Sequence, residues 1–153
     1  MMPIASDVIA RLAGKTLVTA ESLTGGGIGT ALTAVPGASA VYKGGVISYT
    51  DEVKRGVLGV PAAYLSNFGA VSAPVAEAMA LGALQLMQAD VAVAVTGLAG
   101  PGGDEFGHPV GTVFIGYCSK TMGFSREYHF SGDRESIRNQ TIEAALQLIF
   151  ENA

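Results

Sequence analysis

A serine directly ahead of a glycine run is the feature of this sequence best suited to chemistry. The segment from Ala20 to Gly27 reads Ala-Glu-Ser-Leu-Thr-Gly-Gly-Gly. Glycines let several backbone N–H groups converge on one point, and a helix start behind them adds about half a positive charge. Ser22 is therefore a candidate nucleophile, with Thr24, Gly25 and Gly26 as candidate substrate or oxyanion contacts. Ser22 and Thr24 are also good N-cap residues, and helix capping explains either one equally well.

The standard motifs for serine, phosphate and metal chemistry are missing from the sequence around Ser22. It lies in neither G-x-S-x-G nor S-x-x-K, and the glycines complete neither a P-loop nor G-x-G-x-x-G. The two histidines, His108 and His129, are remote from Ser22 in the sequence. We therefore predict neither a Ser-His-Asp triad nor a metal site.

A nucleophilic Ser22 without histidine needs another base, and Lys54 is the candidate. Lys54 follows the end of a predicted strand in a largely apolar segment. The lysine pKa is about 10.4 in water, so the amine must be desolvated or near another cation to accept a proton at neutral pH. Tyr49, at the strand end, is placed to relay the proton or orient the amine. The alternatives are a solvated helical lysine and a half-buried strand tyrosine.

A second glycine-rich loop follows a continuously apolar segment, 91–95, which is typical of a central strand buried on both faces. Because open α/β sheets bind ligands beyond the carboxyl ends of their strands, Thr96 and Gly97 are expected to face the site. A turn contact explains Thr96 equally well. Arg134 and Arg138 begin the last predicted helix, where a cation is favourable only beside a bound anion.

Apolar periodicity, capping residues and breakers predict one alternation of strands and helices. Asp51, Ser72 and Asp133 are the predicted helix caps, and Lys54 lies on the short helix that Asp51 begins. The predicted helices are 7–13, 27–35, a short one after residue 51, one after residue 72, and 133–150; the predicted strands are 16–19, 41–49, 91–95, and a hairpin of 111–118 and 124–130.

Composition favours one globular domain over residues 1–153, because 49% of the residues are hydrophobic and only 14% are charged. There is no run of about 18 apolar residues and no signal peptide pattern, so we expect a cytoplasmic protein. The net charge of −4 argues against nucleic acid and anionic membranes as partners and favours small molecules. The lone Cys118 fits core packing, and the many glycines with few charges favour a homo-oligomer.

Several segments together resemble one known family, the C-terminal domain of the competence/damage-inducible protein CinA. The resemblance follows one order along nearly the whole chain, and the sequence is similar to stand-alone members. It rests on segments 19–26 (Thr-Ala-Glu-Ser-Leu-Thr-Gly-Gly), 36–39 (Pro-Gly-Ala-Ser), 45–54 (Gly-Val-Ile-Ser-Tyr-Thr-Asp-Glu-Val-Lys), 96–103, 109–113 and 130–134.

The resemblance implies a three-layer α/β/α sandwich with a mixed sheet. It also implies an amidohydrolase that converts nicotinamide mononucleotide and water into nicotinic acid mononucleotide and ammonia, without metal or cofactor. Its implied site residues are Ser22 as nucleophile, Lys54 and Tyr49 as its catalytic partners, Ser39 and Thr96 as polar lining residues, and Arg134 as a further site residue. We expect Arg134 to bind the substrate phosphate, with Arg138, one turn later, sharing that role. The alternative is a non-catalytic nucleotide-binding or regulatory module linked to competence or DNA damage.

Overall fold

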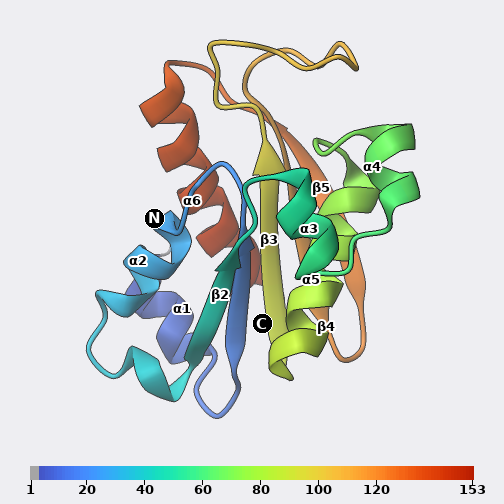
Figure 1. The fold of residues 1–153 in the computed structure, drawn as a ribbon. Coiled ribbons are helices and arrows are strands. Elements are labelled where there is room, and N and C mark those ends of the chain that lie inside the picture. Colours follow the sequence, from blue (N-terminus) through green and yellow to red (C-terminus); the bar gives the residue numbers. More distant parts are fainter. Residues whose placement is uncertain (1–3) are drawn as a thin grey trace.

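Five strands form a single mixed sheet in the computed structural model, which describes residues 4–153 (Figure 1). The strand order is β2-β1-β3-β4-β5, in which β2, β1 and β3 are parallel and β4 and β5 are antiparallel to their neighbours. The strands are β1 (Leu17–Glu21), β2 (Tyr42–Ile47), β3 (Val91–Gly97), β4 (Thr112–Ser119) and β5 (Gly123–His129).

The register brings the carboxyl ends of the three parallel strands to one edge of the sheet. Glu21, the last residue of β1, pairs with Ile47 of β2 on one side and with Val95 of β3 on the other. The residues that follow these positions are Ser22, Ser48 and Thr96, so three hydroxyl side chains come together at this edge.

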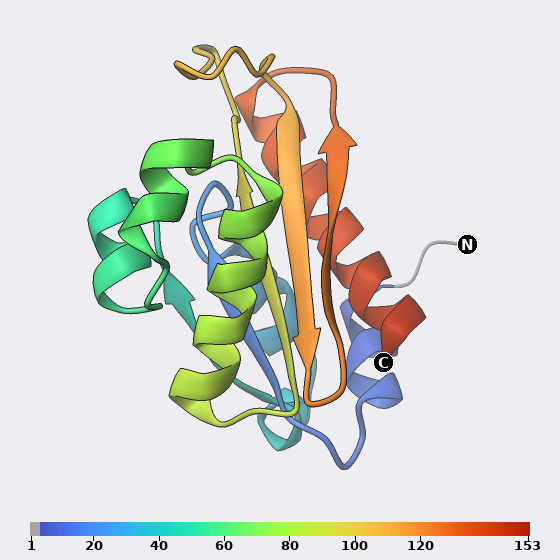
Figure 2. The same ribbon diagram turned by 90° about the vertical axis from the view of Figure 1, so that its right-hand side faces the viewer.

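Helices cover both faces of the sheet, as the two views show (Figures 1 and 2). Alternate residues of β3 point to opposite faces: Val93 joins the core under α1, α2 and α6, and Ala94 joins the core under α5. The expected three-layer α/β/α sandwich with a mixed sheet is therefore confirmed. One outer layer holds α1 (Ala5–Arg11), α2 (Gly27–Thr33) and α6 (Arg134–Asn152); the other holds α3 (Asp51–Gly56), α4 (Ala62–Phe68) and α5 (Ala73–Met87).

Two of the three predicted helix caps are confirmed. The Ser72 side chain accepts from the Val75 amide at the start of α5, and the Asp133 side chain accepts from the Ser136 amide at the start of α6. The prediction for α3 is wrong, because Thr50 is the N-cap and Asp51 lies in the first turn. Asp51 thereby keeps its carboxylate free of the capping role.

The predicted elements are present, with ends that differ by one or two residues. The extension of β1 to Glu21 is the difference that matters most, because it makes Ser22 the first residue after the strand. The sequence patterns did not predict α4 or the short 3-10 helix Ala38–Ala40. α4 has only seven residues, which is too short for helical periodicity to mark it clearly, and none of them is buried. No helix within residues 4–153 combines the length and the apolar character that crossing a membrane requires.

Candidate active site

The Ser22 hydroxyl and the Lys54 amine meet at the carboxyl edge of the parallel strands. Lys54 Nζ lies 3.1 Å from Ser22 Oγ. Ser22 follows β1, and α3, which carries Lys54, follows the neighbouring strand β2. Lys54 is only 1% exposed and Ser22 only 6%, so the contact is shielded from bulk water.

Two backbone carbonyl groups hold the Lys54 amine. Nζ donates to the Ser48 oxygen at 2.8 Å and to the Tyr49 oxygen at 3.1 Å. Burial lowers the pKa of Lys54, and the charge of Asp51 acts in the opposite direction. A neutral amine has two N–H donors and one lone pair. If the carbonyl groups take both donors, the lone pair is left for the hydroxyl proton of Ser22.

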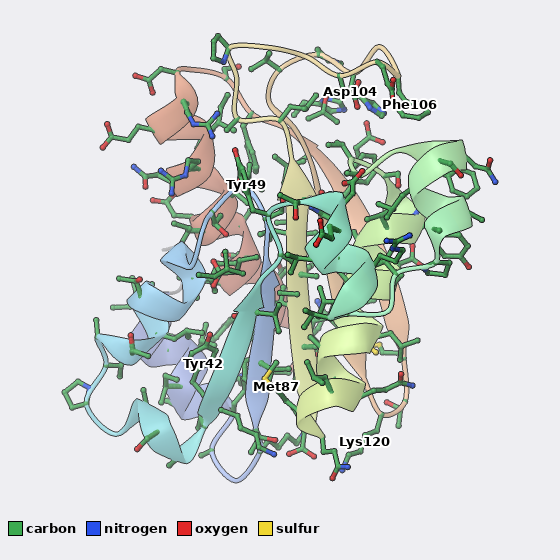
Figure 3. All side chains as sticks on the ribbon, in the orientation of Figure 1. Tyr42, Tyr49, Met87, Asp104, Phe106 and Lys120 are labelled. Atoms are coloured by element: carbon green, nitrogen blue, oxygen red, sulfur yellow. The ribbon has the colours of Figure 1, made fainter. Side chains whose placement is uncertain are left out.

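A cavity of about 480 Å³ opens over this serine–lysine pair, and a space of this size suits a small molecule. Strand ends form its floor, and the loop between β3 and β4 forms part of its wall. In Figure 3, Tyr49 lies near the strand ends, and Asp104 and Phe106 lie on this loop above α4. The lining residues are Ser22, Tyr49, Asp51, Lys54, Leu65, Gly69, Ala70, Val71, Thr96, Gly97, Leu98, Asp104, Glu105 and Phe106.

Glu21 is a buried carboxylate that the sequence analysis did not single out. Its side chain accepts from the Thr24 hydroxyl at 2.7 Å and from the amides of Ile28 at 2.8 Å and Gly29 at 3.0 Å. The N-terminus of α2 therefore binds a carboxylate of the protein itself, which completes the favourable interaction with the helix dipole. A carboxylate a few residues ahead of a helix start was the signal for this arrangement.

The Thr24 hydroxyl and the Gly25 amide bind within the loop, which corrects their expected role as contacts of a ligand. Thr24 is 1% exposed and donates to Glu21, and the Gly25 amide donates to the Ser22 carbonyl oxygen at 3.1 Å. Thr24, Gly25 and Gly26 do not line the cavity. The Thr24 hydroxyl and the Gly25 amide therefore shape the loop that carries Ser22 rather than face a ligand, whereas the amides of Thr24 and Gly26 donate to no acceptor within residues 4–153.

Ser39 and Thr96 were both expected to line the site, and only Thr96 does. Ser39 is exposed in the short helix Ala38–Ala40, which precedes β2, whereas the serine–lysine pair lies beyond the other end of that strand. Six strand residues span roughly 20 Å, so Ser39 is not a lining residue of this cavity. Thr96 lines the cavity with Gly97, as expected, and its hydroxyl donates to the Ala70 carbonyl oxygen at 2.8 Å.

Tyr49 contacts Lys54 through its backbone and not through its ring. The ring is 58% exposed, and its hydroxyl accepts from Arg134 Nη2 at 3.1 Å. Arg134 Nη1 also donates to the Gly100 carbonyl oxygen at 2.6 Å. Arg134 therefore lies at the rim of the site, between the two loops that follow β2 and β3.

Arg138 contacts the loop that carries Ser22. Its Nε donates to the Leu23 carbonyl oxygen at 2.9 Å, and its Nη2 donates to the Thr24 carbonyl oxygen at 3.2 Å. The two arginines expected to share one role thus have different partners. Arg138 holds the serine loop, and Arg134 holds the rim.

Ser48 is a second residue that the sequence analysis left without a role. Its carbonyl group holds Lys54, and its buried hydroxyl has no hydrogen-bond partner among residues 4–153. The sequence patterns also did not point to the acidic and aromatic residues of the loop after β3, because these residues match no motif.

Within the part of the chain that the structure describes, no three His, Cys, Asp or Glu side chains are grouped to hold a metal ion.

Comparison with known proteins agrees with the fold and the motifs. A 47% identical relative over 130 residues is the nicotinamide-nucleotide amidohydrolase PncC of Pseudomonas putida, with 85% of this chain and 81% of that protein covered. A putative competence-damage inducible protein of Desulforamulus reducens is 48% identical over 136 residues, which are 89% of this chain and 33% of that protein. This chain thus spans about a third of the length of such relatives.

Solved structures share the whole architecture. The competence/damage inducible protein CihA from Agrobacterium tumefaciens superposes with a TM-score of 0.93 at 39% identity, covering 99% of this chain and 97% of that one. A competence damage-inducible protein from Klebsiella pneumoniae gives a TM-score of 0.92 at 36% identity, with 98% and 97% covered. The family model of the CinA C-terminal domain matches residues 2–153. On this evidence the chain belongs to the CinA C-terminal domain family.

Proposed function

We propose that this protein is an amidohydrolase that deamidates nicotinamide mononucleotide to nicotinic acid mononucleotide and ammonia. The observation that carries the proposal is the buried 3.1 Å contact between Lys54 Nζ and Ser22 Oγ under an open cavity. The name of the Pseudomonas putida relative supports the substrate. A hydroxyl activated by a desolvated amine is a recognised form of nucleophilic catalysis.

Acylation begins with attack of Ser22 Oγ on the carboxamide carbon, while neutral Lys54 takes the hydroxyl proton. A C–O bond forms, and the carbonyl electron pair moves to oxygen. The Lys54 ammonium then gives its proton to the amide nitrogen, the C–N bond breaks, and ammonia leaves. Lys54 is neutral again, and the acid product remains as an ester of Ser22.

Water completes the reaction by the same route. Lys54 takes a proton from the water as it attacks the ester carbon, and the tetrahedral intermediate collapses with return of that proton to Ser22 Oγ. The products are the carboxylic acid, which ionises in solution, and free enzyme. Neither step requires an oxidant, a reductant or a metal ion in this scheme.

Backbone amides beside Ser22 supply the donors for the oxyanion in our proposal. The amides of Leu23 and Thr24 donate to no acceptor within residues 4–153, whereas those of Ile28 and Gly29 bind Glu21. The amide that follows a nucleophile is a common oxyanion donor in serine hydrolases. One such donor is typically worth ~3–4 kcal/mol in the transition state.

Arg134 is the proposed ligand of the substrate phosphate. It lies at the rim of the site and at the start of α6, where the helix dipole also favours an anion. Its guanidinium group contacts the Tyr49 hydroxyl at 3.1 Å, a neutral partner that a phosphate oxygen would replace with a stronger charge-assisted bond.

A non-catalytic nucleotide-binding module is the alternative, and one observation favours it. Several similar relatives are named only as CinA-like or competence-damage inducible proteins and are about three times as long as this chain. A binding module would use the same cavity without turnover.

Ammonia release from nicotinamide mononucleotide separates the two functions. We expect the wild type to release ammonia and Ser22→Ala to lose at least about a thousandfold in rate while keeping its circular dichroism spectrum, because the nucleophile is gone. Ser66→Ala, at an exposed serine of α4, is the matched control and should stay active. Equal rates for Ser22→Ala and the wild type would exclude Ser22 as the nucleophile, and no ammonia from the wild type would favour the binding module.

A further inference from the structure

The cavity over Ser22 has an acidic wall. Asp51, in the first turn of α3, and Asp104 and Glu105, in the loop between β3 and β4, all line it. Lys54 is the one cationic side chain among the described lining residues, and burial lowers its pKa. The acylation step proposed above needs this amine in its neutral form. A ligand in the cavity therefore meets a negative potential that Lys54 does not cancel.

His108 fixes Asp104 in place. The His108 amide donates to one carboxylate oxygen of Asp104 at 2.9 Å, and the His108 ring nitrogen Nδ1 lies 2.8 Å from the other. Burial acts to raise the pKa of Asp104, but the hydrogen bonds and the charge of His108, together with the Phe106 amide, outweigh it and lower the pKa. Asp104 is thus an ionised carboxylate at neutral pH, with a fixed position on the cavity wall.

Phe106 adds an aromatic face beside these carboxylates. Its ring packs on the backbone of Gly69, where a Cβ atom would lie 2.6 Å from two ring carbons. Gly69 also has a φ of +79°, which residues with a side chain rarely adopt. The Phe106 ring and the backbone conformation therefore both disfavour a side chain at this position. The ring is 41% exposed and lines the cavity. An aromatic ring in such a position attracts a cation or a flat cationic ring.

The acidic wall and the basic rim lie on different sides of the site. Figure 3 shows Asp104 and Phe106 above α4, whereas Tyr49, whose hydroxyl contacts Arg134, lies toward α6. The site is therefore polarised, negative on the side of the loop between β3 and β4 and positive on the side of α6. This polarity matches a ligand with a cationic ring at one end and an anionic group at the other.

We infer that Asp51, Asp104, Glu105 and the Phe106 ring select carboxamides whose ring carries a positive charge, such as N1-substituted pyridinium rings, over neutral ring carboxamides. The inference rests on the proposed function and adds the reason for its substrate class. A cationic ring also withdraws electrons from the carboxamide carbon, which favours attack by Ser22. Free nicotinamide has the same carboxamide on a neutral ring, so the acidic wall gives it no such advantage.

The test compares 1-methylnicotinamide, a cation, with nicotinamide, which is neutral, by chemical-shift titration of the Ser22→Ala protein. Neither probe has a phosphate, so Arg134 does not bias the comparison. We expect the cation to bind more tightly. We also expect Asp51→Asn and Glu105→Gln each to weaken the cation about fivefold, the effect of one solvated charge at close range, and to leave nicotinamide unchanged. Glu52→Gln is the matched control, an exposed carboxylate of α3 outside the cavity lining, and should change neither affinity.

Two results would overturn charge selection: equal affinities of the two probes for the starting protein, or an equal loss for both probes in the Asp51 and Glu105 variants. Ammonia release by the Ser22 enzyme is measured separately. A protein that releases no ammonia but prefers the cation overturns the deamidase proposal and supports charge selection. A protein that deamidates the nucleotide but binds both probes equally overturns charge selection alone.

Discussion

The chemistry of Lys54 depends on the three groups that surround its amine. The carbonyl oxygens of Ser48 and Tyr49 accept hydrogen bonds from Lys54 Nζ, and the third neighbour of the amine is the Ser22 hydroxyl. Fixing the amine in this way removes the rotational freedom that a lysine side chain otherwise has. Burial removes the stabilisation of its charge by water. Position and protonation state are thus set by the same environment.

Replacement of Lys54 tests its role as the base. We expect Lys54→Gln to lower the rate of ammonia release about 10²- to 10⁴-fold, the usual contribution of a positioned base, and to retain nucleotide binding. The rate and the dissociation constant of nicotinamide mononucleotide are both measured. Lys15→Gln, at an exposed lysine, is the control. Full turnover with glutamine at position 54 would eliminate Lys54 as the base.

The pH dependence of kcat follows from the same group. Only neutral Lys54 accepts the Ser22 proton, so kcat should rise with pH through the lowered pKa of Lys54 and level off above it. The Asp51 charge acts to raise that pKa, so Asp51→Asn should move the rise to lower pH. Profiles of kcat for both proteins provide the measurement. A kcat that falls over this pH range, or a rise that Asp51→Asn moves to higher pH, would contradict the assignment.

Among the elements, the junction of β1 and α2 has the arrangement that differs most from expectation. A glycine-rich helix start is a good anion site in general, but here Glu21 reaches the first amides of α2. The carboxylate comes from the strand itself, so the anion that the helix binds is already part of the fold. The junction therefore holds the loop that carries Ser22, and in our proposal the oxyanion binds the amides nearer the serine.

The contact between α5 and the segment after α3 is expected to tolerate no side chain at Gly82. A Cβ atom there would overlap the carbonyl oxygen of Leu58, which is backbone and cannot move aside cheaply. We expect Gly82→Ala to destabilise the protein by about 1–3 kcal/mol, measured by urea unfolding. Gly56→Ala is the matched control, because a Cβ at this glycine of α3 meets nothing within 4 Å. A Gly82→Ala protein as stable as this control would refute the close approach.

Across the whole molecule, the last helix, α6, holds the loop near the start of the chain that carries Ser22. Arg138 of α6 bonds to the carbonyl oxygens of Leu23 and Thr24, more than a hundred residues earlier in the sequence. Arg134 joins the loops after β2 and β3 in the same way. The three-layer packing brings these segments together.

Homo-oligomerisation of this protein stays a prediction, and a measurement of its molar mass in solution tests it.

The two arginines should differ in their kinetic effect. We expect Arg134→Gln to raise KM for nicotinamide mononucleotide by about 10- to 100-fold with a smaller change in kcat, because a charge-assisted bond to phosphate is lost. Arg138→Gln should mainly lower kcat, because the loop that carries Ser22 loses two of its bonds. Steady-state kinetics of both variants provide the measurement. The reverse pattern would exchange the two roles.

The sequence by itself determined the kind of each main element, the layered fold and the pair of residues to examine. Apolar periodicity, caps and glycine breakers are local signals, and they were enough for the strands and for most of the helices. The missed helix α4 has only seven residues and no side-chain N-cap, so its local signal is weak. Ser22 stood out because it precedes a glycine run, and Lys54 stood out as a base in an apolar segment because Ser22 lacked a histidine partner; the family resemblance pointed to the same two residues.

Only the tertiary structure decided what each polar side chain of the site contacts. It placed Ser39 at the far end of β2 and paired the Thr96 hydroxyl with the Ala70 carbonyl oxygen. It also gave Arg134 and Arg138 different hydrogen-bond partners. It also brought Lys54 to Ser22 across 32 residues of sequence. The physical reason is that a hydrogen bond depends on direction and on a distance of about 3 Å, which the packing of remote segments fixes and which local sequence patterns do not contain.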